Sequence, residues 1–176
     1  GKNSNLILCQ NGLILDCARR VWFNSSRVRQ IVPGTAYMPP PVKPRLNPLE
    51  TSASELAAAL AGTAEQPLSK SLMSTVAGIG PQGIAEILHR AGLKPADRFV
   101  ALAPDGQAAL IDAYRSFVEP HRQSPATAYV ASDADGHLLM VGTFDPTSLT
   151  AARLQKFASL NAALAHAATL TAAPKT

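Results

Sequence analysis

Residues 75–92 read TVAGIGPQGIAEILHRAG, and this stretch decides how the middle of the chain folds. The segment Gly78–Gly80 places Ile79 between two glycines, and Pro81 follows directly. Because glycine commonly ends a helix and proline favours the first helical position, the pattern predicts a helix-hairpin-helix over 67–92. Backbone N–H groups at the start of its second helix favour a phosphate, and a plain helical corner is the alternative interpretation.

Helical patterns continue on both sides of this turn. Residues 51–62, TSASELAAALAG, begin with Ser52 and Glu55 at the spacing of a capping box, which predicts a helix start. The first helix of the hairpin is expected to begin at Pro67 and to end at Gly78. Later segments add a long amphipathic helix over 105–120 and a final helix over 154–170, LQKFASLNAALAHAATL.

Two β-hairpins are expected, one toward each end of the chain. In NLILCQNGLILDC, Asn11-Gly12 is a strong turn signal, and this register sets Leu6 opposite Cys17. Cys9 and Cys17 then lie on opposite faces and too far apart for a disulfide, and two free thiols fit a reducing cytoplasm. The second hairpin, over 126–144, is expected to turn at Asp135-Gly136.

This order predicts an α+β fold in which both hairpins contribute to one sheet, with the helical region between them. We expect three parts: a β-rich part with a proline-rich connector over 1–50, the helical region over 51–122, and a hairpin with a helix over 123–176 that returns to the first part.

Charge is concentrated in the first 50 residues. They hold seven Lys or Arg against two acidic residues, a net charge of +5, whereas the whole chain carries +4. Such a basic end suggests a polyanionic partner, and a solvated basic face is the alternative interpretation. No apolar run in the sequence is long enough for a membrane span.

Nothing in the sequence supports an enzyme. The four histidines lack metal-ligand spacing, neither cysteine belongs to a C-x-x-C pair, and no P-loop or nucleophile elbow is present. Asp133-Ala134-Asp135-Gly136 resembles the start of a calcium loop but lacks the glutamate that completes one, so a hairpin turn is the better interpretation. We therefore predict no catalytic residue, metal or cofactor.

Several quoted stretches together resemble one family. These are GKNSNLIL (1–8), ILDCARRV (14–21), SSRVRQIVPGTAYMPPP (25–41), NPLE (47–50), the turn VAGIGPQGIAEIL (76–88), and the closing segments over 128–149 and 157–167. They resemble the NFACT family, the RqcH-type ribosome quality-control factors that are also called fibronectin-binding protein A-like. The resemblance covers the back half of the NFACT N-terminal domain plus the helix-hairpin-helix, so we expect the chain to be a part of a longer protein.

The resemblance implies a cytoplasmic, RNA-binding role in translation. Family members bind the large ribosomal subunit with its obstructed nascent chain and tRNA, and bacterial members recruit alanyl-tRNA to add a C-terminal alanine tail. The basic residues then have phosphate as a target. The candidate nucleic-acid-binding residues are Lys2, Asn5, Arg19, Arg20, Arg27, Arg29, Gly78, Ile79 and Gly80.

Alternatives remain for individual residues and for the whole chain. Lys2 and Asn5 could simply start and fix the first strand, and Trp22 and Tyr37 could stack on a base or fill a core. Two other functions are possible: a surface adhesin for fibronectin, which would need export, and a DNA-binding helix-hairpin-helix module related to DNA glycosylases, which would need a catalytic pocket. Binding of tRNA in preference to duplex DNA and fibronectin discriminates among them.

Overall fold

The computed structural model describes residues 4–25, 29–40, 44–122, 127–150 and 152–170. The chain divides into two compact units, Gly1–Pro44 and Arg45–Thr176, and each is described by itself. Both helices and strands are present, which confirms the α+β class. The three-part division at residues 50 and 122 stays a prediction.

The first unit is built on a hairpin of β1 (Ile7–Gln10) and β2 (Leu13–Cys17). Asn11 and Gly12 both have positive φ, 49° and 78°, as a tight two-residue turn requires. A bulge between Leu8 and Cys9 shifts the register, so Ile7 and not Leu6 lies opposite Cys17. Both thiols are free, as expected.

A loop closes over one face of this hairpin. The N–H of Ile14 donates to the carbonyl of Thr35, and Val21 exchanges two backbone hydrogen bonds with Ile31. Ile14, Ile31 and Val32 are consequently buried. The rest of the hairpin exposes large apolar side chains, including Leu6, Leu8, Leu13 and Leu15.

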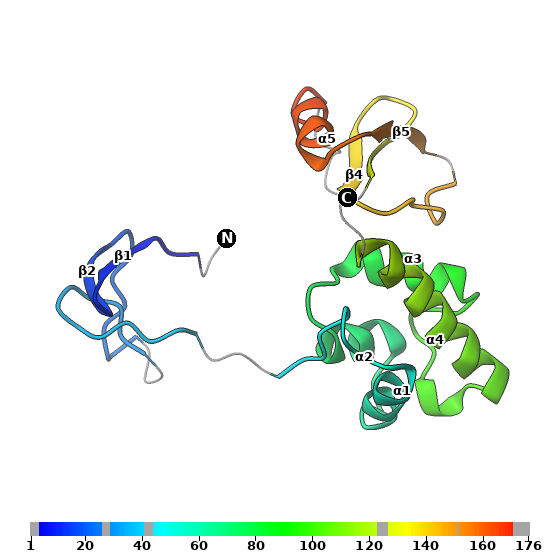
Figure 1. Ribbon diagram of the computed structural model, residues 1–176, viewed down its shortest axis with the longest axis horizontal. Coiled ribbons are helices and arrows are strands. Elements are labelled where there is room, and N and C mark those ends of the chain that lie inside the picture. The colour runs from blue at the N-terminus through cyan, green and yellow to red at the C-terminus, as the bar shows by residue number, and fades with distance from the viewer. Residues whose placement is uncertain (1–3, 26–28, 41–43, 123–126, 151, 171–176) are drawn as a thin grey trace. The chain divides into compact units, whose positions relative to one another are not determined.

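The second unit contains a helical core (Figure 1). Its helices are α1 (Ala53–Ala61), α2 (Leu68–Thr75), α3 (Pro81–Arg90) and α4 (Pro104–Val118), with the short 3-10 helices η1 (Phe99–Ala101) and η2 (Glu119–His121). The capping box predicted for α1 is present, since Ser52 accepts from the N–H of Glu55 and Glu55 accepts from the N–H of Ser52. However, α2 ends at Thr75, three residues before the predicted stop, because Val76 adopts an extended conformation.

Leucines, isoleucines and aromatic residues from these helices form one core. Its fully buried members include Leu56, Leu60, Leu72, Ile87 and Leu110. Burial of a side chain of this size contributes about 1.5–3 kcal/mol. The long helix expected over 105–120 places Leu110, Tyr114, Phe117 and Val118 in this core, as its apolar pattern predicted.

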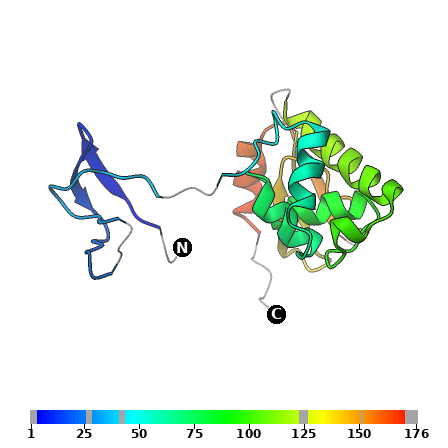
Figure 2. The same ribbon diagram turned by 90° about the horizontal axis from the view of Figure 1, so that it is seen from below.

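A three-stranded antiparallel sheet follows, in the order β4-β3-β5. Its strands are β3 (Ala128–Ser132), β4 (Leu138–Gly142) and β5 (Arg153–Phe157), and α5 (Leu160–Ala167) packs against it through Ala163 and Ala167 (Figures 1 and 2). The second predicted hairpin is therefore present as β3 and β4.

One expectation about this region is corrected, and another is not confirmed. Residues 154–157 were expected to begin the final helix, but they form β5 because they pair with β3 along its second edge. The helix begins later, at Leu160, where the Ser159 hydroxyl accepts the N–H of Ala162. Within the described residues, β1 and β2 also form a sheet of their own, so the single shared sheet is not confirmed.

Candidate nucleic-acid interface

The connection between α2 and α3 is the turn predicted from Gly78 and Gly80. Gly78 has φ +75°, a left-handed conformation that side chains other than glycine rarely adopt. Gly80 has φ −81° and ψ 176°, which any residue can adopt. The turn therefore requires glycine only at position 78. At Gly80, an added Cβ would meet no atom within 4 Å, so the missing side chain keeps the surface there open.

Ile79 anchors the turn to the helical core, as either interpretation of the turn predicted. Its half-buried side chain packs against the core cluster. A Cβ added to Gly83 would lie 2.9 Å from both Ile79 Cγ2 and Phe117 Cζ. The first turn of α3 is thus held tightly between the connection and α4.

The start of α3 carries no side-chain cap. Gly80 is the N-cap residue and Pro81 occupies the first helical position. The side chain of Gln82 points to another partner, since its amide donates to the carbonyl of Leu139 at 3.1 Å. Pro81 has no N–H, so the N–H groups of Gln82 and Gly83, at the positive end of the helix dipole, are the ones left for an acceptor such as a phosphate oxygen.

A pocket of about 660 Å³ adjoins this turn. Residues 78–83 form one side of it, and Phe117, His121, Thr143 and Phe144 line the remainder together with the segment around Pro48. Its walls are mostly apolar. The pocket thus combines an apolar interior with the exposed N-terminal turn of α3.

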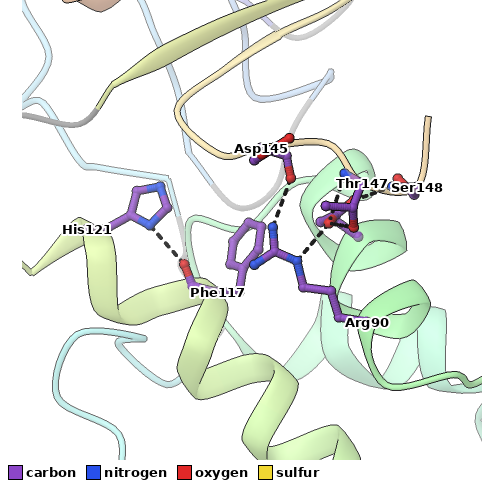
Figure 3. Close-up of polar contacts among 7 residues, drawn as sticks. Arg90, Phe117, His121, Asp145, Thr147 and Ser148 are labelled. Atoms are coloured by element: carbon purple, nitrogen blue, oxygen red, sulfur yellow. Dashed lines mark hydrogen bonds and ion pairs between the residues drawn. The ribbon is translucent and has the colours of Figure 1, made fainter. Parts of the chain in front are cut away.

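His121 is fixed in the wall of this pocket. Its Nδ1 donates to the carbonyl of Phe117 at 3.0 Å (Figure 3). Its Nε2 accepts from the hydroxyl of Thr143 at 2.9 Å. The imidazole also stacks on the Phe117 ring, with centroids 5.7 Å apart. Both nitrogens are hydrogen-bonded, so His121 joins the end of the helical region to Thr143, the residue that follows β4.

Glu86 ties α3 to the chain after β4. Its buried carboxylate accepts from the hydroxyl and N–H of Thr147, at 2.6 and 3.2 Å, and from the N–H of Ser148 at 2.9 Å. Burial alone would raise the pKa of Glu86, but these hydrogen bonds and the one from Arg90 outweigh it and lower the pKa to about 2. Glu86 is therefore a structural anion across the physiological pH range.

Arg90 completes this connection, which is drawn in Figure 3. Its Nε donates to Glu86 at 2.7 Å, and a terminal nitrogen donates to the carbonyl of Asp145 at 2.8 Å. The guanidinium also lies 5.8 Å from the centre of the Phe117 ring. Together Glu86 and Arg90 hold residues 145–148 against α3, beside the 660 Å³ pocket.

The basic candidates lie in the first unit. Arg19 and Arg20 are exposed, and Arg29 is half-buried with its guanidinium donating to the carbonyl of Met38 at 2.8 Å. Lys2 and Arg27 lie outside the described residues. The arginines and the turn thus belong to different units, and the structure describes each candidate group separately.

Asn5 has a structural role that was foreseen as an alternative. Its side chain accepts the N–H of Arg19 at 2.9 Å and donates to the carbonyl of Arg19 at 2.7 Å.

The alternative that Trp22 and Tyr37 fill a core is wrong within the first unit, because they are 55% and 40% exposed. They remain available for stacking.

The DADG segment forms the predicted hairpin turn. Asp133 accepts the N–H groups of Asp135 and His137, and its second carboxylate oxygen lies 2.9 Å from His137 Nδ1. These bonds lower the pKa of Asp133, with the His137 N–H as the main cause. The side-chain atoms of Asp133, Asp135 and His137 that could bind a metal ion lie within 4.8 Å of one another. The hydrogen bonds of the turn already account for this geometry.

Sequence reasoning missed the hydrogen bonds that join Glu86 to residues 147–148. It also missed the part of the pocket that Phe117, His121, Thr143 and Phe144 line. The only local signal was the position of Glu86 between Ile84 and Ile87, on the face of α3 that enters the core.

In the described part of the chain, no helix is long and apolar enough to cross a membrane.

Comparison with known proteins supports the resemblance. The family model described as NFACT N-terminal and middle domains matches residues 1–166. The protein named Rqc2 homolog RqcH from Bacillus subtilis (strain 168) is 30% identical over 95 residues, which are 53% of this chain and 16% of that protein.

Two solved structures share the fold. The fibrinogen binding protein from Staphylococcus aureus matches with a TM-score of 0.69 and 21% identity, over 93% of this chain and 55% of that one. The N-terminal part of the fibronectin/fibrinogen-binding protein from Streptococcus suis matches with a TM-score of 0.59 and 22% identity, over 94% of this chain and 52% of that one. The chain thus spans about half the length of these structures and a smaller part of the Bacillus protein.

Proposed function

Because the chain belongs to the family of NFACT N-terminal and middle domains, we propose that it is the RNA-binding part of a ribosome quality-control factor. The proposed partners are tRNA, alanyl-tRNA in the whole protein, and the large ribosomal subunit with an obstructed nascent chain. In a bacterial protein this binding serves C-terminal alanine tailing. The relative named as an Rqc2 homolog supports a role of this kind.

The observation that carries the proposal is the uncapped start of α3 at Gly80. An added Cβ at Gly80 meets nothing within 4 Å, so a phosphate can approach the first-turn N–H groups closely. Contacts of this kind read the backbone and not the bases. The basic first unit, with Arg19 and Arg20 exposed, supplies positive charge for further phosphates.

The decisive variant is Gly80→Asp. An aspartate at the N-cap accepts the first-turn N–H groups itself and complements the helix dipole, so it stabilises α3 by about 0.5–1 kcal/mol. The same carboxylate occupies the phosphate site and repels the phosphate itself. We therefore expect a more stable protein that binds tRNA about tenfold more weakly.

Ala103→Asp is the matched control. Ala103 is the exposed N-cap of α4, also has no side-chain cap, and also precedes a proline. The substitution makes the same charge change at a helix start outside the proposed site. Binding should be measured by fluorescence anisotropy with labelled tRNA and duplex DNA, at several salt concentrations. Equal weakening by both variants would show that only overall charge matters.

The arginines are tested by Arg19→Gln/Arg20→Gln, with Arg98→Gln as a control of exposed charge elsewhere. Each lost phosphate contact lowers the slope of log affinity against log salt concentration by about 0.7–0.9. An unchanged slope in the double variant would remove these arginines from the interface. The names of the two structural neighbours suggest fibronectin or fibrinogen as a second kind of ligand, so labelled fibronectin belongs in the same titration.

A further inference from the structure

A second pocket, of about 510 Å³, lies where the start of α1 meets the end of α4. The segment 48–53 lines one side of it, and residues between Tyr114 and Arg122 line the other. It shares Pro48 and Val118 with the 660 Å³ pocket, but none of residues 78–83 line it. Its volume falls in the range of sites for small molecules.

Tyr114 provides the first sign that this pocket takes a ligand. Its side chain is 2% exposed, and its hydroxyl is the only buried side-chain polar atom in the described residues that has no hydrogen-bond partner. A buried hydroxyl without a partner is costly, so such groups are rare and need an explanation. A ligand in the pocket that Tyr114 lines would supply the missing bond.

Two positive groups line the same pocket as Tyr114. Arg115 and Arg122 both line the pocket, and the charge of Arg122 acts on Tyr114, where it partly offsets the effect of burial in raising the pKa of the phenol. Arg122 uses only its Nε in the ion pair with Glu119, at 3.3 Å. Within the described residues, Arg115 makes no ion pair. Two guanidinium groups are therefore available to an anion.

The start of α1 contributes N–H donors to the same pocket. Ser52 and Ala53 line it, and the capping box satisfies the N–H of Glu55 but not those of the first two helical residues. The helix dipole is positive at this end. This helix start would carry no argument without the unpartnered tyrosine, which is an independent observation.

Two carboxylates restrict the ligand further. Glu50 and Glu119 also line the pocket, so the lining charges of the two arginines are balanced. A simple anion would meet repulsion from these carboxylates, which accept hydrogen bonds and cannot donate them. The ligand must therefore carry an anionic group and hydroxyl or amino donors together.

We propose that this pocket binds a ribonucleotide, with its phosphate at Arg115, Arg122 and the start of α1, and its ribose hydroxyls at Glu50 and Glu119. The hydroxyl of Tyr114 forms a further hydrogen bond to the ligand. Because the Tyr114 oxygen is buried, binding requires a nearby side chain to shift, and we assign this movement to Arg122, whose side chain is 43% exposed. The ribonucleotide is either free or one residue of an RNA strand.

This inference goes beyond the proposed function, because it concerns another site and holds for a free nucleotide as well. Tyr114→Phe reports on this pocket, whereas Gly80→Asp reports on the turn. The failure of one proposal is thus distinguishable from the failure of the other.

The test is calorimetric titration of the 176-residue protein with AMP, GMP, CMP and UMP, and with dAMP and inorganic phosphate as comparisons. We expect at least one ribonucleotide to bind more tightly than its deoxy form and than phosphate. Tyr114→Phe removes one oxygen, and we expect it to raise the melting temperature while weakening nucleotide binding by about five- to tenfold. Arg115→Gln should weaken binding similarly, and Arg98→Gln should not change it.

Competition with tRNA identifies the source. Displacement of the bound nucleotide by tRNA indicates a residue of an RNA strand, and the lack of displacement indicates a free nucleotide. The proposal is overturned if Tyr114→Phe melts at a higher temperature yet leaves both ribonucleotide and tRNA affinities unchanged, because the hydroxyl would then be only an unpaired group.

Discussion

The hydroxyl of Thr147 donates a hydrogen bond of 2.6 Å to the carboxylate of Glu86, which lies 61 residues earlier in the chain. The N–H groups of Thr147 and Ser148 and the guanidinium of Arg90 donate to the same carboxylate. One buried side chain of α3 therefore fixes the segment that follows β4. Because this segment borders the 660 Å³ pocket, Glu86 also determines the shape of the candidate interface.

Glu86→Gln should destabilise the protein by about 2–4 kcal/mol. The amide nitrogen replaces an oxygen that accepts from N–H or hydroxyl donors, and Arg90 loses the charge of its partner. Urea unfolding monitored by circular dichroism measures the change. Glu65→Gln is the control, since Glu65 pairs with Arg98 at the surface and its loss should cost less than about 1 kcal/mol. Similar losses in both variants would show that the buried carboxylate has no special role.

Stability should fall as the pH drops from about 5 toward 2. The pKa of Glu86 is lowered from 4.5 to about 2 in the folded protein, so the unfolded state binds this proton more readily. Its stabilisation is complete above the unfolded pKa and is lost as the pH falls through the folded pKa, which amounts to about 3 kcal/mol. Urea unfolding of wild type and Glu86→Gln at pH 6, 4 and 2.5 isolates the contribution of the Glu86 carboxylate to the free energy of unfolding. The difference between the two proteins should shrink with the pH, and a constant difference contradicts the assignment.

Gly83→Ala should destabilise the protein by about 1–2 kcal/mol, despite the better helix propensity of alanine. The new Cβ would lie 2.9 Å from Ile79 and Phe117, so the turn has to move away from α4. Gly106→Ala is the matched control, because its nearest contact is an ordinary 3.5 Å to Leu102. Melting temperatures should therefore fall for the first variant and stay level or rise for the second. A rise for both would mean that the packing against Phe117 is loose.

Asn5→Ala should open the first unit locally. It removes two hydrogen bonds to the backbone of Arg19, each contributing about 0.5–1.5 kcal/mol. Amide hydrogen exchange at Arg19 should accelerate about tenfold, while exchange at Ala91 in the second unit stays unchanged. Asn5→Asp keeps the oxygen that accepts from Arg19, so protection there should largely remain. If both variants exchange as slowly as wild type, Asn5 does not fix the strand.

Local signals predicted the fold well where neighbours in sequence decide the structure. The capping box of Ser52 and Glu55 and the two-residue turn at Asn11-Gly12 both appear in the structure, because their partners lie within a few residues. The strand β5 could not be predicted in this way. Its sequence RLQKF becomes a strand through pairing with β3, which lies about 25 residues earlier.

The candidate site was predictable only in part for the same reason. The pattern Gly-Ile-Gly-Pro identified the turn and the start of α3, but not that Gly78 alone needs a left-handed conformation. The partners of Glu86 and the isolation of the Tyr114 hydroxyl depend on contacts between distant segments. Periodicity places Tyr114 on the apolar face of its helix but says nothing about its hydroxyl, and it does not predict the burial of Glu86.

The separation between Glu86 and Thr147 also affects how the chain folds during its own synthesis. At about 5–20 residues per second, a ribosome adds the 61 residues between them in roughly 3–12 s. Until then α3 carries a carboxylate whose donors from 147–148 do not yet exist, with only Arg90 as its partner. The helices can assemble on the ribosome, but the final closure of the second unit has to wait for the chain beyond β4.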